Sequence, residues 1–366
     1  MHTILILGGY GFFGERIGEA LRKHPSIRLL IAGRDREKAR QAAQRLGLAT
    51  EQGIAVDAHA PDLAQTLQAH GIKTVIHTAG PFQGQDYAVA QAAIAARANY
   101  IDLADGREFV AGIASLDAAA RAAGVLVTSG ASSLPALSSA VVDRYLPRFS
   151  RLDAIRHGIG SAARAPGLAT MRGVFGYCGK PFQRLEQGQW RTVYGWLDSI
   201  RYRFPAPVGT RRLGSCDVPD LALFPSRYPG VRSVSFHAGF AGAAGHLVVW
   251  AGAQLVRLGL LASLTPWAAP LHGLSGWVEA FVSDKGGMFV TMEGSGTDGA
   301  PLTLTWHVVA AQNHGPHIPC GASIALARKL AQGETLPHGA MPCMGLLKVE
   351  DYLAALAGLD VRELPA

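Results

Sequence analysis

The sequence predicts an α/β protein whose first third is a Rossmann-type, doubly wound parallel sheet. Six strand-like patterns alternate with helix-like patterns before residue 130, and a glycine-rich turn joins the first strand to the first helix. The alternation stops near Ser132, where segments rich in glycine, proline and aromatic residues begin. Regular alternation of this kind builds a parallel sheet with right-handed crossovers, and the later change of pattern predicts a second domain.

The first strand and its turn are the most informative segment. Residues 3–7 form an apolar run, and Gly9, Gly11 and Gly14 follow it in the spacing G-x-G-x-x-G, before a helix-like pattern that runs to His24. Gly9 permits the tight turn, Gly11 lets the backbone approach a pyrophosphate, and Gly14 lets the helix pack against its strand. The segment therefore predicts a dinucleotide site at a helix N-terminus.

The end of the second strand indicates which dinucleotide binds. Residues 28–32 are strand-like, and Gly33 and Arg34 follow where an NAD site usually has an acidic residue. A guanidinium at Arg34 can pair with a 2′-phosphate, so NADP(H) is favoured over NAD(H). Asp35 keeps NAD open if the turn is shifted by one residue, and Arg34 as a plain surface residue is the alternative interpretation.

The other elements of the first third follow in order. They are helix 37–46, strand 53–57, helix 61–70, strand 74–77, helix 86–97, strand 100–103, helix 107–123 and strand 125–128. Ligands of such sheets bind beyond the carboxyl ends of the strands. Asp57 is then a candidate contact to the adenine amino group, and the turn of Ala79, Gly80, Pro81 and Phe82 a candidate contact to the ribose and nicotinamide. A helix cap at Asp57 and an ordinary turn at Gly80 are the alternatives.

Two carboxylates are the candidates for proton transfer. Asp102 and Asp105 follow the fifth strand, nearest the expected nicotinamide end, and Tyr100 and Ser129 are candidate hydrogen-bonding partners. The alternative is that one of the two carboxylates caps the helix that starts near Arg107.

Composition bounds the function. The chain has 366 residues, enough for two domains, with 49% hydrophobic and 17% charged residues, as in a globular protein. The net charge of +7 is dispersed, which argues against a nucleic-acid surface and fits anionic small molecules. The four cysteines include no C-x-x-C pair, and no basic leader precedes the first strand, so a reducing, cytoplasmic setting is expected.

The middle of the chain predicts a mixed α/β domain with an antiparallel sheet. Its expected elements are turns and strands over 175–182, strands over 190–196 and 231–236, and a long hairpin formed by 288–293 and 302–307. Helix patterns return at 321–332 and 348–358.

One apolar segment, 246–265, has nearly the length of a membrane span. Arg257 lies in its middle, and a charge near a bilayer centre is costly, so a buried or interface helix is favoured over membrane contact.

Several motifs are missing. No Tyr-x-x-x-Lys, P-loop, G-x-S-x-G or H-E-x-x-H is found, which argues against classical short-chain dehydrogenases, P-loop proteins, α/β-hydrolases and zincins. His307, His314, His317 and Cys320 are close in sequence but lack metal-ligand spacing, so we expect a structural or substrate-lining loop and no metal.

The motifs together resemble those of saccharopine dehydrogenase-like proteins. The resemblance lies in residues 8–14, which include Phe12 and Phe13, in 32–34, 77–82, 100–103 and 129–135, and in a closing segment from Gly315. It implies an NADP-binding domain over 1–131, an inserted substrate and dimerisation domain over 132–320, and C-terminal helices over 321–366 that return to the first domain. The cofactor residues it implies are Gly8, Gly9, Gly11, Phe12, Phe13, Gly14, Arg34, Asp57, Ala79, Gly80, Pro81, Phe82 and Gly130.

The same resemblance implies a homodimeric, NADP(H)-dependent oxidoreductase. Hydride would move to or from a C=N, C=O or activated C=C bond of a small substrate. True saccharopine reductases carry Asp-Pro-Gly where this chain has Leu134-Pro135-Ala136. The resemblance therefore supports the family's cofactor for this chain more strongly than it supports the family's substrate. An enoyl-reductase-like enzyme acting on a lipid precursor and a non-catalytic NADP-binding protein are the alternatives. A substrate with carboxylates could be clamped by arginines, the candidates being Arg164, Arg172, Arg211 and Arg212.

Overall fold

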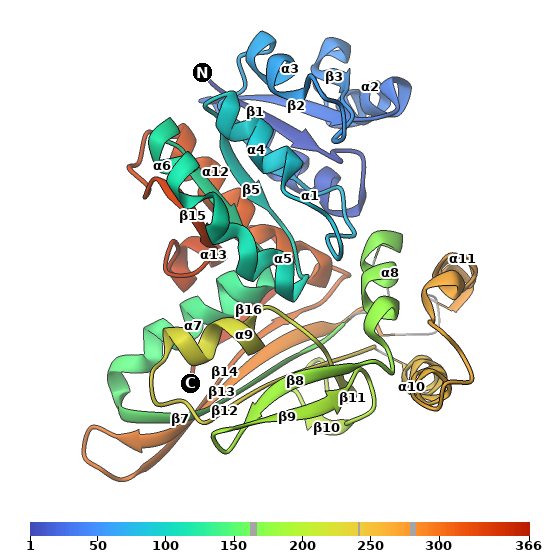
Figure 1. Cartoon of the computed structure of the whole chain (residues 1–366), viewed down its shortest axis with the longest axis vertical. Coiled ribbons are helices and arrows are strands. Elements are labelled where there is room, and N and C mark those ends of the chain that lie inside the picture. The colour runs from blue at the N-terminus through green and yellow to red at the C-terminus, as the bar shows by residue number, and fades with distance from the viewer. Residues whose placement is uncertain (162–166, 241, 279–282) are drawn as a thin grey trace. The chain divides into compact units, whose positions relative to one another are not determined.

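The chain forms two compact units (Figure 1). The computed structural model describes residues 1–161, 167–240, 242–278 and 283–366. The first unit contains Met1–Leu137 and His317–Leu356, and the second contains Ser138–Pro316 and Ala357–Ala366. The chain therefore enters the second unit after η3 (Ser133–Leu137), returns to the first near His317, and ends in the second.

The first unit is built on a seven-stranded parallel sheet in the order β15-β6-β5-β4-β1-β2-β3. Its strands are β1 (His2–Leu7), β2 (Ile27–Gly33), β3 (Gly53–Ala55), β4 (Thr74–His77), β5 (Asn99–Asp102), β6 (Leu126–Ser129) and β15 (Gly339–Pro342). The first six have the order 3-2-1-4-5-6 of a doubly wound dinucleotide-binding sheet, which confirms the predicted class. The sequence did not predict β15, because a four-residue strand beginning with glycine and ending with proline has little strand signal.

Helices cover both faces of this sheet. They are α1 (Phe12–Leu21), α2 (Arg36–Arg45), α3 (Leu63–Ala69), α4 (Ala88–Ala95), α5 (Arg107–Gly112), α6 (Asp117–Ala123), α12 (Gly321–Ala331) and α13 (Val349–Ala355). Leu5 and Leu7 of β1 pack in one apolar cluster with residues of α3, α4 and α6. Ile6, between them, lies toward Gly18 of α1 on the other face, as the alternation of side chains along a strand requires.

The predicted helix 107–123 is wrong in one respect, because it is interrupted. A 3₁₀ turn, η2 (Ile113–Leu116), separates α5 from α6. The Tyr87 hydroxyl donates a hydrogen bond to the Phe109 carbonyl at 2.8 Å, which is the carbonyl that Ile113 N–H would use in a continuous α-helix. Gly112 makes room for this contact, since a Cβ there would lie 2.5 Å from the Tyr87 hydroxyl oxygen.

The second unit has its own seven-stranded sheet, in the order β10-β11-β12-β7-β13-β14-β16. Its strands are β7 (Phe149–Gly160), β10 (Ile200–Arg203), β11 (Thr210–Ser215), β12 (Ser233–Gly239), β13 (Gly286–Gly296), β14 (Pro301–Ala310) and β16 (Val361–Leu364). The pairs are antiparallel except β12 with β7. The expected long hairpin is confirmed as β13 and β14, whereas β16 places the chain's last strand in this sheet.

This sheet curls. Tyr202 of the edge strand β10 stacks on Phe289 of β13, with ring centroids 3.7 Å apart, although three strands separate the two in the sheet order. Phe204, Val208, Leu213 and Val309 complete the small apolar cluster on this concave face. A separate hairpin, β8 (Pro181–Glu186) and β9 (Gln189–Tyr194), lies beside β12.

The helices of the second unit are α7 (Ser138–Tyr145), α8 (Leu168–Tyr177), α9 (Asp220–Arg227), α10 (Ala243–Arg257) and α11 (Ala268–Val278). The prediction of turns and strands over 175–182 is wrong at its start, because α8 runs to Tyr177. Met171 and Phe175 are buried on α8. Their packing outweighs the low helix propensity of Gly173 and Gly176.

Candidate cofactor site

The glycine loop is bound to the second strand through the backbone. The N–H groups of Gly8 and Gly9 both donate to the Ala32 carbonyl at 2.9 Å. Gly8 has a φ of +83°, a conformation that other residues rarely adopt. The chain therefore turns sharply after β1, and α1 starts directly above the carboxyl end of the strand.

Close packing leaves no room for side chains at the motif glycines. A Cβ at Gly14 would lie 2.4 Å from the Gly8 carbonyl oxygen, and one at Gly9 would lie 2.8 Å from the Ile6 carbonyl oxygen. Gly11 is the N-cap of α1 and is exposed, and its missing side chain leaves the helix N-terminus open to a ligand. This is the arrangement that accepts a pyrophosphate in doubly wound folds.

Phe12 and Phe13 flank the first turn of α1. Their rings meet edge to face with centroids 5.1 Å apart, and the Arg16 guanidinium lies 4.0 Å from the centre of the Phe12 ring. Both phenylalanines are half-buried. They lie in the first turn of α1, directly after the glycine loop, and pack beside it.

The end of β2 leaves Arg34 exposed. Its neighbour Asp35 caps α2, because the Asp35 carboxylate accepts a hydrogen bond from Lys38 N–H at 3.0 Å. This backbone hydrogen bond lowers the pKa of Asp35. The geometry assigns Asp35 a capping role, and the exposed guanidinium of Arg34 directly follows the strand end.

Tyr10 is a residue of this site that sequence reasoning missed. Its hydroxyl accepts a hydrogen bond from Asp35 N–H at 3.3 Å, and a Cβ at Gly33 would lie 2.4 Å from its ring. Tyr10 therefore joins the glycine loop to the end of β2. Gly33 at the strand end was the one hint in the sequence, but that Tyr10 lies against it depends on β1 and β2 being neighbours.

The turn after β4 is bound to the glycine loop. Thr78 Oγ1 donates to the Leu7 and Gly8 carbonyls at 3.0 and 3.1 Å. Gln85 Nε2 donates to the Ala79 and Pro81 carbonyls at 3.1 and 2.7 Å, which fixes the turn that contains Gly80. Residues 79–81 are half-buried, so their backbone borders the same strand ends as the glycine loop.

Phe82 is buried and does not face solvent. Its ring packs against His77 and Phe109, with centroids 5.1 and 5.3 Å apart. His77 is also buried, and its Nδ1 lies 3.0 Å from the Tyr100 hydroxyl oxygen. Burial lowers the pKa of His77 to about 4, so the ring is neutral at physiological pH.

Asp102 is fully buried at the end of β5. Its Oδ1 accepts hydrogen bonds at 2.9 Å from Ala104 N–H, Gly130 N–H and the Ser129 hydroxyl. Burial raises the pKa of Asp102 to about 6, although these donors and Tyr100 favour the ionised form. The carboxylate thereby joins the ends of β5 and β6 and holds Gly130, whose φ is +78°, in its turn.

Asp105 differs from Asp102 because it is half-buried. Gln83 Nε2 donates a hydrogen bond to its Oδ1 at 3.0 Å, and burial raises its pKa. A carboxyl group that has access to solvent and a raised pKa holds a proton more readily than an ordinary exposed carboxylate, which suits it to proton exchange.

The structure brings most predicted cofactor residues to one edge of the sheet. The ends of β1, β2 and β4 are adjacent, so the glycine loop, Arg34 and Ala79 lie along the same edge. Asp57 follows β3, the outermost strand, where it is exposed and accepts a hydrogen bond from His59 N–H at 3.0 Å. It caps a local turn there.

The sequence offered four arginines as candidates for a substrate clamp, and the structure describes three of them. Arg164 lies outside the described residues. Arg211 is buried in β11 and donates to the Lys285 carbonyl at 3.4 Å, while the adjacent Arg212 is exposed. Consecutive residues of a strand point to opposite faces. Arg172 is exposed on α8.

The histidines near the end of the second unit have separate partners. His307 Nε2 lies 2.8 Å from the Tyr202 hydroxyl oxygen, and His314 Nδ1 accepts a hydrogen bond from Asp360 N–H at 2.8 Å. Within the described ranges, no group of three His, Cys, Asp or Glu side chains is arranged to hold a metal ion. All four cysteines are buried, and none of them forms a disulfide.

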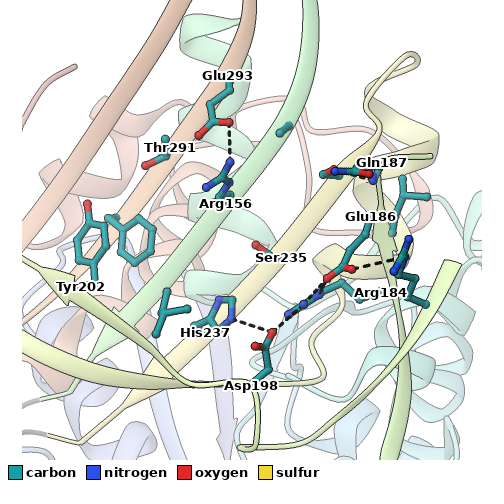
Figure 2. A pocket seen from close by; sticks show the side chains of 16 residues that line it. Arg156, Arg184, Glu186, Gln187, Asp198, Tyr202, Ser235, His237, Thr291 and Glu293 are labelled. Carbon is teal, nitrogen blue, oxygen red and sulfur yellow. Dashed lines mark hydrogen bonds and ion pairs between the residues drawn. The ribbon is translucent and has the colours of Figure 1, made fainter. Parts of the chain in front are cut away.

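A cavity of about 530 Å³ lies on the concave face of the second sheet. Figure 2 shows its charged side chains pairing among themselves. Arg184 is buried and bonds to Glu186 and to Asp198, the latter at 2.7 Å, while Arg156 pairs with Glu293 at the rim at 2.8 Å. Three arginines and three carboxylates line the cavity, so its charge is balanced.

The apolar segment 246–265 is helical only in part, since α10 ends at Arg257. Among the residues that the structure describes, no helix is both long enough and apolar enough to span a membrane.

Comparison with known proteins shows what the chain is similar to. Residues 4–128 match the model of the saccharopine dehydrogenase NADP binding domain. No curated protein matches the sequence. The structure is similar to apo saccharopine dehydrogenase (L-Glu forming) from Saccharomyces cerevisiae, with a TM-score of 0.69 and 13% identity over 100% of both chains.

A second similar structure is an amine dehydrogenase from Mycobacterium smegmatis. The TM-score is 0.50 at 12% identity, over 96% of this chain and 95% of the other. At 12–13% identity, the similarity establishes the fold alone. The aligned residues cover both units of the chain. The predicted resemblance to saccharopine dehydrogenase-like proteins is confirmed.

Proposed function

Residues 4–128 belong to the family of saccharopine dehydrogenase NADP binding domains, and from this premise we propose that the chain is an NADP(H)-dependent oxidoreductase. The observation that carries the proposal is the contact between Gly14 and the Gly8 carbonyl. Only glycine at position 14 lets α1 begin so close to the end of β1, and this closeness is what a bound pyrophosphate needs. The residues present therefore fit a dinucleotide.

NADP(H) is proposed over NAD(H) because of Arg34. Asp35 is engaged as the cap of α2, whereas the guanidinium of Arg34 is exposed directly after β2, which suits a 2′-phosphate. The bound cofactor would supply or accept a hydride. The bond reduced or oxidised in a small substrate would be C=N, C=O or activated C=C.

We assign different roles to the two carboxylates of the β5 end. Asp105 is proposed to exchange the proton, because it is half-buried and its pKa is raised. Asp102 is proposed as a positioning residue, because it is fully buried and accepts three hydrogen bonds that fix the turn at Gly130.

Titration of the purified chain with NADPH and with NADH, followed by cofactor fluorescence, tests the proposal. We expect NADPH to bind more tightly, and one member of an imine, keto-acid and enoyl panel to be reduced. Equal or absent binding of both cofactors would contradict the cofactor assignment. Tight NADPH binding without turnover of any class would favour a non-catalytic NADP-binding protein.

A further inference from the structure

The large apolar side chains that the second unit exposes are concentrated in one segment. Six of the ten large hydrophobic side chains exposed among the described residues lie between Leu247 and Trp267. They are Leu247, Val248, Leu255, Leu258, Leu260 and Trp267. Leu258 and Leu260 are more than two-thirds exposed, at 69% and 68%. Scattered apolar side chains are normal on a protein surface, but a gathered set indicates a binding surface.

The exposed alanine, valine and leucine side chains of α10 and of its C-cap, Leu258, form a single stripe. Leu247, Val248, Leu255 and Leu258 recur at spacings that place them on one side of a helix, and exposed Ala244 and Ala251 fall between them. The opposite side of α10 carries the buried His246, Val249 and Ala253. The helix therefore packs on the protein by one side and presents an apolar side outward.

The charge of this region has one sign. None of the helices α8, α10 and α11 contains an aspartate or glutamate. Their cationic residues, Arg172 and Arg257, are both exposed, and the Arg257 guanidinium lies over the Tyr194 ring at 4.4 Å. Figure 1 shows the three helices gathered at one side of the second unit.

We propose that the stripe of α10, with Leu260 and Trp267 beyond it, docks on the surface of a lipid bilayer that contains anionic phospholipid. An apolar helix side, in a group of helices that carries exposed arginines and no acidic residue, is complementary to an anionic interface, into which it can bury leucine and tryptophan side chains. A second copy of this chain is a poorer occupant, because self-contact through the stripe would bring cations of the same sign together. The expectation was a buried or interface helix; α10 is buried on one side only, and we propose an interface with lipid for its exposed side. The proposal does not rest on the proposed function.

Co-flotation of the full chain with vesicles tests the proposal. One set of vesicles contains phosphatidylcholine alone, and the other contains phosphatidylcholine and phosphatidylglycerol in equal parts. We expect binding to the anionic vesicles and at least a tenfold lower fraction on the neutral ones. Added salt should weaken the binding, because Arg172 and Arg257 then contribute less.

Two matched variants distinguish vesicle binding through the stripe from nonspecific adsorption of the protein. Leu258→Glu places a charge on the stripe, and Leu146→Glu makes the same change at a half-exposed leucine of the second unit outside it. We expect at least a tenfold loss of vesicle binding for L258E and wild-type binding for L146E. NADPH binding by L258E should be unchanged, which checks its fold and keeps this test separate from that of the proposed function.

Two outcomes would overturn the proposal. One is a wild-type chain that stays off both kinds of vesicle. The other is a dimer in sedimentation that L258E dissociates while neither protein binds vesicles, which would make the stripe a contact between copies.

Discussion

The Oδ1 atom of Asp102 accepts a hydrogen bond from the backbone N–H of Gly130 at 2.9 Å, and so joins the ends of two neighbouring strands. Because the carboxyl group is fully buried, its pKa is raised from 3.8 to about 6. The folded chain therefore holds a proton on Asp102 at pH values where the unfolded chain has lost it. The stability that this protonation adds is full below the unfolded pKa and is lost as the pH rises through about 6.

Asp102→Asn should remove this pH dependence. The free-energy advantage of the wild type over D102N should fall by roughly 3 kcal/mol between pH about 4 and about 7, and stay level above that. Urea unfolding of both proteins across this range measures it. An advantage that rises with pH would contradict the raised pKa of Asp102.

His77→Gln should show the opposite sign. The pKa of buried His77 is lowered from 6.5 to about 4, so between these values the unfolded chain binds a proton that the folded chain does not. Stability from neutral His77 is complete above the unfolded pKa and is lost as the pH falls toward 4. In the same urea series, the wild type should lose roughly 3 kcal/mol relative to H77Q on acidification. If the difference in unfolding free energy from the wild type changed with pH in the same direction for H77Q and D102N, the lowered pKa of His77 and the raised pKa of Asp102 would both be contradicted.

Gly14→Ala should damage the cofactor loop. The new methyl group would lie 2.4 Å from the Gly8 carbonyl oxygen and 2.7 Å from the Gly9 Cα, both of which are backbone atoms that cannot turn aside. We expect a stability loss of about 1–3 kcal/mol and at least a tenfold loss of NADPH affinity.

Gly273→Ala is the matched control for that substitution. Gly273 lies in α11 with nothing within 4 Å of the added Cβ, so alanine should be tolerated or slightly stabilising there. Equal melting temperatures and equal NADPH affinities for G14A and the wild type would show that α1 does not depend on this contact.

These glycines show which part of the site the sequence could predict. The spacing of Gly9, Gly11 and Gly14 is a local signal, because each glycine acts on its own turn. The contact of Tyr10 with Gly33 was not predictable in the same way, since it depends on β1 and β2 being neighbours with Leu7 beside Ala32. Contacts between residues of neighbouring strands can be predicted only when the order of the strands in the sheet is known.

The same limit applies to Asp102 and to the end of the chain. The sequence placed Asp102 correctly at a strand end, but its burial depends on β6 and on the loop that follows it. Strands β15 and β16 are four residues each and carry little pattern of their own. Their partners, β6 and β14, lie far from them in sequence, and pairing with those partners makes them strands.

Arg184→Met should destabilise the second unit. The buried guanidinium of Arg184 bonds to Glu186 and Asp198. A hydrogen bond from His237, and then the bond and charge of Arg184, hold the pKa of Asp198 well below its usual range. Methionine fills similar space but leaves the two carboxylates without this partner, at a cost of about 1–3 kcal/mol because both are partly exposed. Arg151→Met removes an exposed pair with Asp153 and should leave the urea midpoint almost unchanged. Equal midpoints for R184M and R151M would mean that burial adds nothing to the Arg184 cluster.

Arg34→Ala should change the choice of cofactor more than the stability of the fold. Arg34 is exposed at the carboxyl end of β2, beside the loop that would hold the pyrophosphate, whereas Asp35 is engaged in capping α2. A charge-assisted contact with a 2′-phosphate contributes about 1.5–3 kcal/mol, and the exposure of Arg34 favours the lower figure, which is about tenfold in affinity.

The measurement is the ratio of NADPH to NADH dissociation constants for the wild type and R34A. We expect NADPH binding to weaken about tenfold and NADH binding to stay within twofold, because NADH lacks the phosphate. Arg28→Ala is the control, since Arg28 is exposed on the same strand but lies toward its other end. It removes one positive charge without touching the site, so it should leave the ratio unchanged. If R34A weakened both cofactors equally, Arg34 would be supporting the loop, and the preference for NADP(H) would have to come from another residue.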